Sequence, residues 1–170
     1  MGQMTPKDFI QQVLIKEVGE IHISHPYISF LTMSVGIEFL GKCLNGINDW
    51  NRGGRSKDDF EDAINNLNAF SKYRPLLQSH DFWTSFRNGF AHSFVPKNTL
   101  TLSSKDEDPH FTDISLPKIN LRCEDMYNDF KDACLEVFNM TFPPHDKMNF
   151  PLLDVPSTPT DNISSSGTTY

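Results

Sequence analysis

The chain has little cysteine and no excess of positive charge. Its 170 residues include 3 cysteines, with no C-x-x-C pair, and 15 basic against 22 acidic residues, for a formal net charge of −7. The odd cysteine count and the lack of a basic, then apolar leader argue against a disulfide-stapled secreted domain, so a cytoplasmic location is expected. The acidic balance excludes a general nucleic-acid coating protein. Any contact with RNA must therefore use a local basic patch.

No apolar run is long and pure enough to predict a membrane span. The richest stretch, residues 27–44, is interrupted by polar and charged side chains, Glu38 and Lys42 among them. No contact with a membrane is therefore expected. Phenylalanine, in contrast, is abundant, with 14 copies, and 38% apolar residues are enough for one packed core.

Apolar residues recur at helical spacing in five parts of the chain. This periodicity predicts helices over about residues 5–20, 28–44, 57–70, 81–94 and 121–140. Thr5 followed by Pro6 is a typical helix start, and Pro96 ends the fourth pattern. Residues 73–79 are expected to form a bend. The sequence thus predicts a mainly α-helical protein.

Between the last two helices the pattern changes to alternation. Leu100 and Leu102 alternate with polar residues, a polar turn follows, and Ile114 and Leu116 alternate again, which predicts a β-hairpin over about residues 99–118. Residues 143–170 are rich in proline, serine and threonine and have too few apolar residues to offset the entropy of ordering. We therefore expect one domain over residues 1–142 and a flexible, largely disordered tail.

The segment R-N-G-F-A-H at residues 87–92 holds catalytic residue types within the fourth predicted helix. On a wheel of about 100° per residue, the aromatic side chains of this helix share the core face. They are Phe82, Trp83, Phe86, Phe90 and Phe94. Asn88 and His92 fall on the opposite side, and Arg87 lies about 140° from His92. An arginine that holds a phosphate and an imidazole that moves protons form a minimal set for cutting a phosphodiester.

Small residues beside His92 suggest how the arginine could meet the histidine. Ser85 and Gly89 would let a second helix approach closely in a symmetric dimer, which places two sets of these side chains along one groove. A glycine in mid-helix costs about 1 kcal/mol relative to alanine, so its presence needs such a reason. The sequence therefore favours a composite site between two subunits.

This hexapeptide, inside a small helical protein, resembles the motif of the HEPN superfamily (higher eukaryotes and prokaryotes nucleotide-binding). The resemblance covers about residues 5–140. It implies an up-and-down helical bundle, a homodimer and often metal-independent RNA cleavage, with no metal and no cofactor. Arg87 and His92 would be the catalytic pair in the dimer cleft, and Asn88 their polar neighbour. HEPN toxins paired with nucleotidyltransferase antitoxins often carry a tyrosine where this chain has Phe94.

The first functional hypothesis is an endoribonuclease, acting as a toxin or defence protein, with an RNA substrate and an antitoxin as partners. Lys72, Arg74, Arg87 and Lys97 outweigh Asp81 over residues 70–97, which favours local contact with phosphate. The candidate substrate-binding residues are Arg74, Lys97 and Ser85. A second match to the motif spacing, at residues 74–80, is interrupted by Pro75.

The second hypothesis is a non-catalytic dimer that binds a protein or a nucleotide in the same groove. The third is a scaffold or immunity component that acts through a peptide motif in the tail, around residues 150–153. The first two make different structural predictions. An exposed Arg87 with no carboxylate partner would favour the nuclease, whereas a buried, salt-bridged Arg87 would favour the binding module. Glu38 could orient Arg87, but Lys42, one turn further on, is the preferred partner of Glu38.

Overall fold

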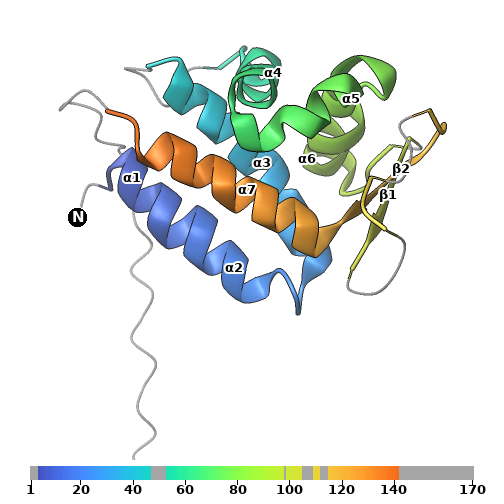
Figure 1. Cartoon of the computed structure of the whole chain (residues 1–170), viewed down its shortest axis with the longest axis horizontal. Coiled ribbons are helices and arrows are strands. Elements are labelled where there is room, and N and C mark those ends of the chain that lie inside the picture. The colour runs from blue at the N-terminus through green and yellow to red at the C-terminus, as the bar shows by residue number, and fades with distance from the viewer. Residues whose placement is uncertain (1–3, 47–52, 98, 105–108, 112–114, 142–170) are drawn as a thin grey trace, which may run out of the picture.

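A computed structural model of the chain describes residues 4–46, 53–97, 99–104, 109–111 and 115–141. Within these ranges the protein is mainly helical, with a small two-stranded sheet at one end of the helical body (Figure 1). The mainly helical fold class is therefore confirmed. The predicted tail, residues 143–170, lies outside the described residues.

The first predicted helix is continuous but changes its winding. It begins as α1 (Pro6–Phe9), continues as the π-helical segment η1 (Ile10–Glu17) and ends as α2 (Val18–Ile21). The backbone N–H of Asp8 donates to the Thr5 hydroxyl at 3.1 Å, and the backbone N–H of Thr5 donates to the Asp8 carboxylate at 2.9 Å. This reciprocal cap satisfies N–H groups that the helix leaves unpaired, and it confirms the predicted start.

Helix α3 (Pro26–Leu44) forms the centre of the core. It packs against α4 (Ser56–Asn66) and α7 (Cys123–Phe138), and α7 in turn lies beside the first helix (Figure 1). A Cβ on Gly41 would lie 1.6 Å from the backbone oxygen of Asp59 in α4, and a Cβ on Gly36 would lie 2.5 Å from the Phe130 ring. These two glycines therefore set how closely the three helices approach.

Helix α3 is also long and apolar enough, by length and composition alone, to cross a membrane. Buried core helices share this property, and 10 of its 19 residues are buried within the described body. One of the buried residues is Glu38, whose carboxylate is paired as described below.

The chain between α4 and the sheet is more helical than the sequence predicts. After α4 come the 3₁₀ segment η2 (Asn68–Tyr73) and α5 (Arg74–Ser79), followed by the π-helical segment η3 (Trp83–Asn88) and α6 (Gly89–Ser93). The expected bend at residues 73–79 is wrong, because Pro75 lies in the first turn of α5, where a helix does not need its N–H.

The aromatic stripe of the fourth predicted helix is largely confirmed. Phe82, Phe86 and Phe90 are fully buried, and Trp83 is half-buried. Phe94 is 61% exposed instead, because residue 94 adopts the left-handed conformation (φ 56°) that ends α6 and turns its side chain away from the stripe.

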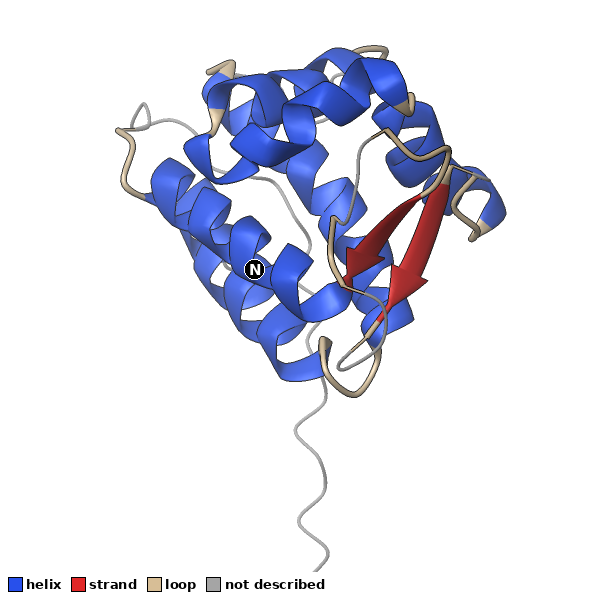
Figure 2. Ribbon diagram, turned by 45° about the vertical axis from the view of Figure 1, so that its right-hand side comes forward, coloured by secondary structure: helices blue, strands red, loops and turns tan. Residues whose placement is uncertain are grey.

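The predicted hairpin is wrong. Strands β1 (Leu100–Ser103) and β2 (Ile119–Arg122) pair in parallel, with Leu100 opposite Ile119, and Figure 2 shows both arrows running the same way. The second strand comes directly before α7, and Leu116 lies in the turn that precedes it. Alternation of apolar residues does not reveal the direction of pairing, and the connection over residues 104–118 is long enough for the crossover that parallel strands require.

Candidate functional site

Arg87 is held by side chains from two helices. Its Nη2 lies 2.5 Å from Oε2 of Glu38 on α3, and Nζ of Lys42 lies 3.3 Å from Oε1 of the same carboxylate. The guanidinium also lies over the Trp83 ring, 5.0 Å from its centroid. The Arg87 side chain is 16% exposed and that of Glu38 is 5% exposed. The arginine is therefore a largely buried, salt-bridged group.

This geometry meets the condition that favours the binding module. The preference for Lys42 as the partner of Glu38 is only half right, because the carboxylate binds both cations and lies closer to Arg87. We call these three residues the Glu38 cluster. Two cations and one carboxylate leave one formal positive charge, in a partly buried place where charges interact more strongly than in water.

His92 and Asn88 take no part in these ion pairs. His92 is exposed in the last turn of α6, and Asn88 is half-buried at the end of η3. Neither side chain has a hydrogen bond or ion pair with any other residue of the described chain. His92 is therefore free to meet a ligand, whereas Arg87 already has a partner.

The strip of small residues is covered by the chain itself, so the prediction that it admits a second helix is wrong. The segment after α6, which we call the return segment (residues 95–97 and 99), is hydrogen-bonded back to η3. The backbone N–H of Lys97 donates to the Ser85 carbonyl at 2.9 Å, and the Thr99 hydroxyl donates to the Ser85 hydroxyl at 2.7 Å. A Cβ on Gly89 would lie 2.8 Å from the carbonyl oxygen of Val95. The glycine is thus required by this return.

The three predicted substrate-binding residues have different surroundings. Arg74 donates to the carbonyls of Ile64 and Leu67, both at 3.3 Å, and so caps the end of α4. The Ser85 hydroxyl is buried and engaged by Thr99. Lys97 is exposed, and its ammonium has no partner within the described ranges. Among the three, Lys97 alone offers an unused group to a ligand.

A pocket of about 640 Å³ lies between the end of α5, the η3–α6 helix and the return segment. The pocket is lined by five polar residues without a side-chain hydrogen bond or ion pair in the described part of the protein. They are Gln78, Asp81, Thr84, Ser93 and Lys97. Four of them, all but Lys97, could not be found as site residues from the sequence, because they are spread over three separate parts of the chain and follow no periodic pattern.

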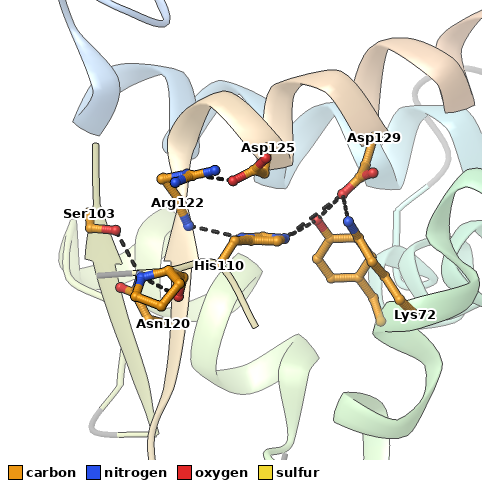
Figure 3. A network of polar contacts seen from close by, with 9 residues as sticks. Lys72, Ser103, His110, Asn120, Arg122, Asp125 and Asp129 are labelled. Atoms are coloured by element: carbon orange, nitrogen blue, oxygen red, sulfur yellow. Dashed lines mark hydrogen bonds and ion pairs between the residues drawn. The ribbon is translucent and has the colours of Figure 1, made fainter. Parts of the chain in front are cut away.

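A second cluster of ionisable side chains joins the β1–β2 connection to the helical body (Figure 3). The Tyr73 hydroxyl donates to Asp129 at 2.6 Å and lies 3.0 Å from Nε2 of His110. Lys72 lies 2.7 Å from the same Asp129 oxygen. The other ring nitrogen of His110, Nδ1, accepts the backbone N–H of Arg122 at 3.0 Å. Residues from η2, α7 and the connection are thereby tied together.

The protonation state of this cluster follows from its hydrogen bonds. An Nδ1 atom that accepts a hydrogen bond carries no proton, so the His110 ring is neutral and its Nε2–H donates to Tyr73. Burial and the nearby Lys72 ammonium lower the pKa of His110 from 6.5 to about 4. Burial and the Asp129 charge raise the pKa of Tyr73 well above 10. The His110 side chain is 7% exposed, so we regard the cluster as a structural clamp.

Comparisons with known proteins assign no family to this chain. No family model, no curated protein and no solved structure matches it. The described residues hold no group of three or more histidines, cysteines or carboxylates placed to bind a metal.

Proposed function

We propose that this protein is a HEPN-like homodimeric module that binds RNA through the surface carrying the Glu38 cluster and His92. The observation that carries the proposal is the 2.5 Å contact between Arg87 and Glu38. A guanidinium held in this way supplies a fixed positive charge, and it is poorly placed to follow a reacting phosphate. Together with Lys42 it leaves a net positive charge that attracts a phosphate backbone.

Exposed apolar side chains support a dimer seam next to this surface. Ile28 and Val35 on α3 are 46% and 44% exposed, and their spacing of seven residues places them on one face of the helix. Phe94 and Val95, directly after α6, are 61% and 57% exposed. Helix α3 contacts both η3, which carries Arg87, and α6, which leads into Phe94. Large exposed apolar residues of this kind mark interaction surfaces.

Binding of a fluorescent single-stranded oligoribonucleotide tests the proposal. The wild-type chain should bind with an affinity that falls as salt rises, because phosphate contacts release counterions. Lys42→Gln should weaken binding by roughly three- to tenfold and reduce the slope of log affinity against log salt by about one. Lys131→Gln, at an exposed position of α7, is the matched control. An equal effect of both substitutions, or no binding at all, would refute the proposal.

The exposed imidazole of His92 favours a second candidate function, the metal-independent endoribonuclease. His92 would take a proton from a ribose 2′-hydroxyl or donate one to the leaving oxygen, while the positive charge of the Glu38 cluster stabilises the charged phosphorane. A role as a toxin or defence protein, and an antitoxin partner, follow from this candidate alone.

Cleavage assays separate the two candidates. If the protein is a nuclease, His92→Ala should lower the cleavage rate by about 10²- to 10⁴-fold and change RNA affinity by only about twofold. The residue is exposed, so the substitution should not disturb the fold. If the wild-type chain binds RNA and the RNA stays intact, the nuclease hypothesis is refuted and the binding module is supported.

A further inference from the structure

Strand β1 has one edge that no other strand of the described chain covers. The Ile119 N–H donates to the Thr99 carbonyl at 2.9 Å, so the odd-numbered residues of β1 face β2 in the parallel ladder. The N–H and C=O of Leu102 therefore point to the opposite edge, where neither has a hydrogen bond within the described residues. An open strand edge of this kind is a template for one more strand.

A narrow pocket of about 120 Å³ lies beside this edge. It is lined by Pro26, Tyr27 and Phe30 at the start of α3 and by residues 102–104 at the end of β1. Small-molecule sites usually have volumes of about 300–1,000 Å³, so this pocket has room for one side chain rather than for a whole ligand. The edge and the pocket together fit an extended peptide that carries an apolar residue opposite Leu102.

The part of the chain that follows α7 is long enough to reach this edge. Helix α7 runs away from the sheet (Figure 1), and its 16 residues are about 24 Å long. Strand spacing adds about 4.8 Å between Arg122, directly before α7, and its partner Ser103 on β1. Residues 139–149 span up to about 36 Å when extended, which exceeds the sum of these two lengths. A chain that returns along α7 can therefore arrive at the Ser103 end of β1 by residue 150.

The sequence around residue 150 has the pattern of a half-buried strand. Its even-numbered positions are Met148, Phe150 and Leu152, and Asn149 and Pro151 lie between them. With Leu152 opposite Leu102, the N–H groups of the even-numbered residues face β1, and Pro151, which has no N–H, faces away from it. Residues directly opposite each other project to the same face of a sheet, so Leu152 enters the pocket that Leu102 lines. A register shifted by one residue would place the proline against β1.

We propose that residues 150–152 add to β1 as a third, antiparallel strand, with the Leu152 side chain in the pocket beside Tyr27 and Phe30. The direction is antiparallel because the returning chain meets the Ser103 end of β1 first. The added strand covers an edge that would otherwise pair with other chains, and it removes apolar surface from water. This inference is independent of RNA binding, because it uses none of the residues of the Glu38 cluster.

Disulfide trapping in the full chain tests the register. In this arrangement Thr101 and Leu153 form a non-hydrogen-bonded pair, whose Cα atoms are about 4.5 Å apart, within the range of a disulfide. Thr101→Cys with Leu153→Cys should form an intramolecular disulfide in a glutathione redox buffer about tenfold or more faster than Thr101→Cys with Ser165→Cys. Thr101 is exposed and the three native cysteines are buried, so neither the fold nor the native thiols should interfere. Equal rates for the two pairs, or a disulfide that joins two chains, would overturn the proposal.

Amide hydrogen exchange, measured by NMR on the full chain, provides a second readout. The Leu102 N–H should be protected in the wild-type chain. Leu152→Asp should speed its exchange by about tenfold or more, because the substitution places a charge in an apolar pocket. Leu153→Asp is the matched control, since residue 153 faces away from the pocket, and it should change this rate by about twofold or less. An unprotected Leu102 N–H in the wild-type chain, or equal effects of the two substitutions, would refute the added strand.

Discussion

At the scale of single residues, Glu38 determines how Arg87 behaves. The sequence places an acidic residue in an apolar helix and offers it two partners, but spacing along one helix cannot reveal a partner on another. In the folded chain the carboxylate binds Lys42 and Arg87 together. The arginine, the asparagine and the histidine of the motif could be found from the sequence. The ion pair that occupies the arginine could not, because it depends on how α3 packs against η3.

Glu38→Gln tests this pair through stability. Removing one partner of a buried ion pair leaves the other charge uncompensated, so the free energy of unfolding should fall by about 3 kcal/mol or more in denaturant titrations. Glu61→Gln is the control, because Glu61 pairs with Lys57 on the surface, at 3.6 Å. This substitution should lower the free energy of unfolding by about 0.5 kcal/mol or less. Equal losses in the two variants would contradict a structural role for the Glu38 cluster.

His110 makes stability depend on pH. The ring is neutral in the fold, with a pKa near 4, but takes up a proton below about 6.5 in the unfolded chain. The unfolded state therefore binds more protons between these values, and stability should fall as the pH drops from 6.5 to 4, by up to about 2 kcal/mol after solvent screening. His110→Gln should flatten this part of the curve of unfolding free energy against pH.

At the scale of helices and strands, local sequence patterns predict where the elements lie better than they predict which segments pack or pair with one another. The cap at Thr5 and the buried faces of Phe82, Phe86 and Phe90 follow from neighbours in the sequence, and they are confirmed. The direction of strand pairing and the segment that covers Gly89 depend on distant residues. Those two predictions are wrong for that reason.

Gly41→Ala should be severely destabilising. Its new Cβ would lie 1.6 Å from the backbone oxygen of Asp59, and a backbone atom of α4 cannot move aside without separating the two helices. We expect a loss of about 3 kcal/mol or more in thermal or denaturant unfolding. Gly53→Ala is the matched control, because no atom lies within 4 Å of a Cβ at that position. A loss at Gly41 no larger than at Gly53 would contradict the close α3–α4 contact.

At the scale of the whole molecule, the proposed dimer depends on the exposed apolar face of α3. Val35→Asp should raise the dimer dissociation constant by about tenfold or more, because it places a charge at the centre of the seam. Leu135→Asp is the control, since Leu135 is similarly exposed, at 40%, but lies on α7. Analytical ultracentrifugation measures both. A wild-type monomer, or equal effects of the two substitutions, would contradict the seam.

The central claim is that a fixed positive charge around Glu38 binds RNA, and equilibrium titration of a labelled single-stranded oligoribonucleotide at several salt concentrations measures it most directly. The account predicts saturable binding that weakens with salt, survives in His92→Ala and is selectively reduced by Lys42→Gln. Absence of binding at low salt would contradict this claim. So would an affinity that changes neither with the salt concentration nor with Lys42→Gln.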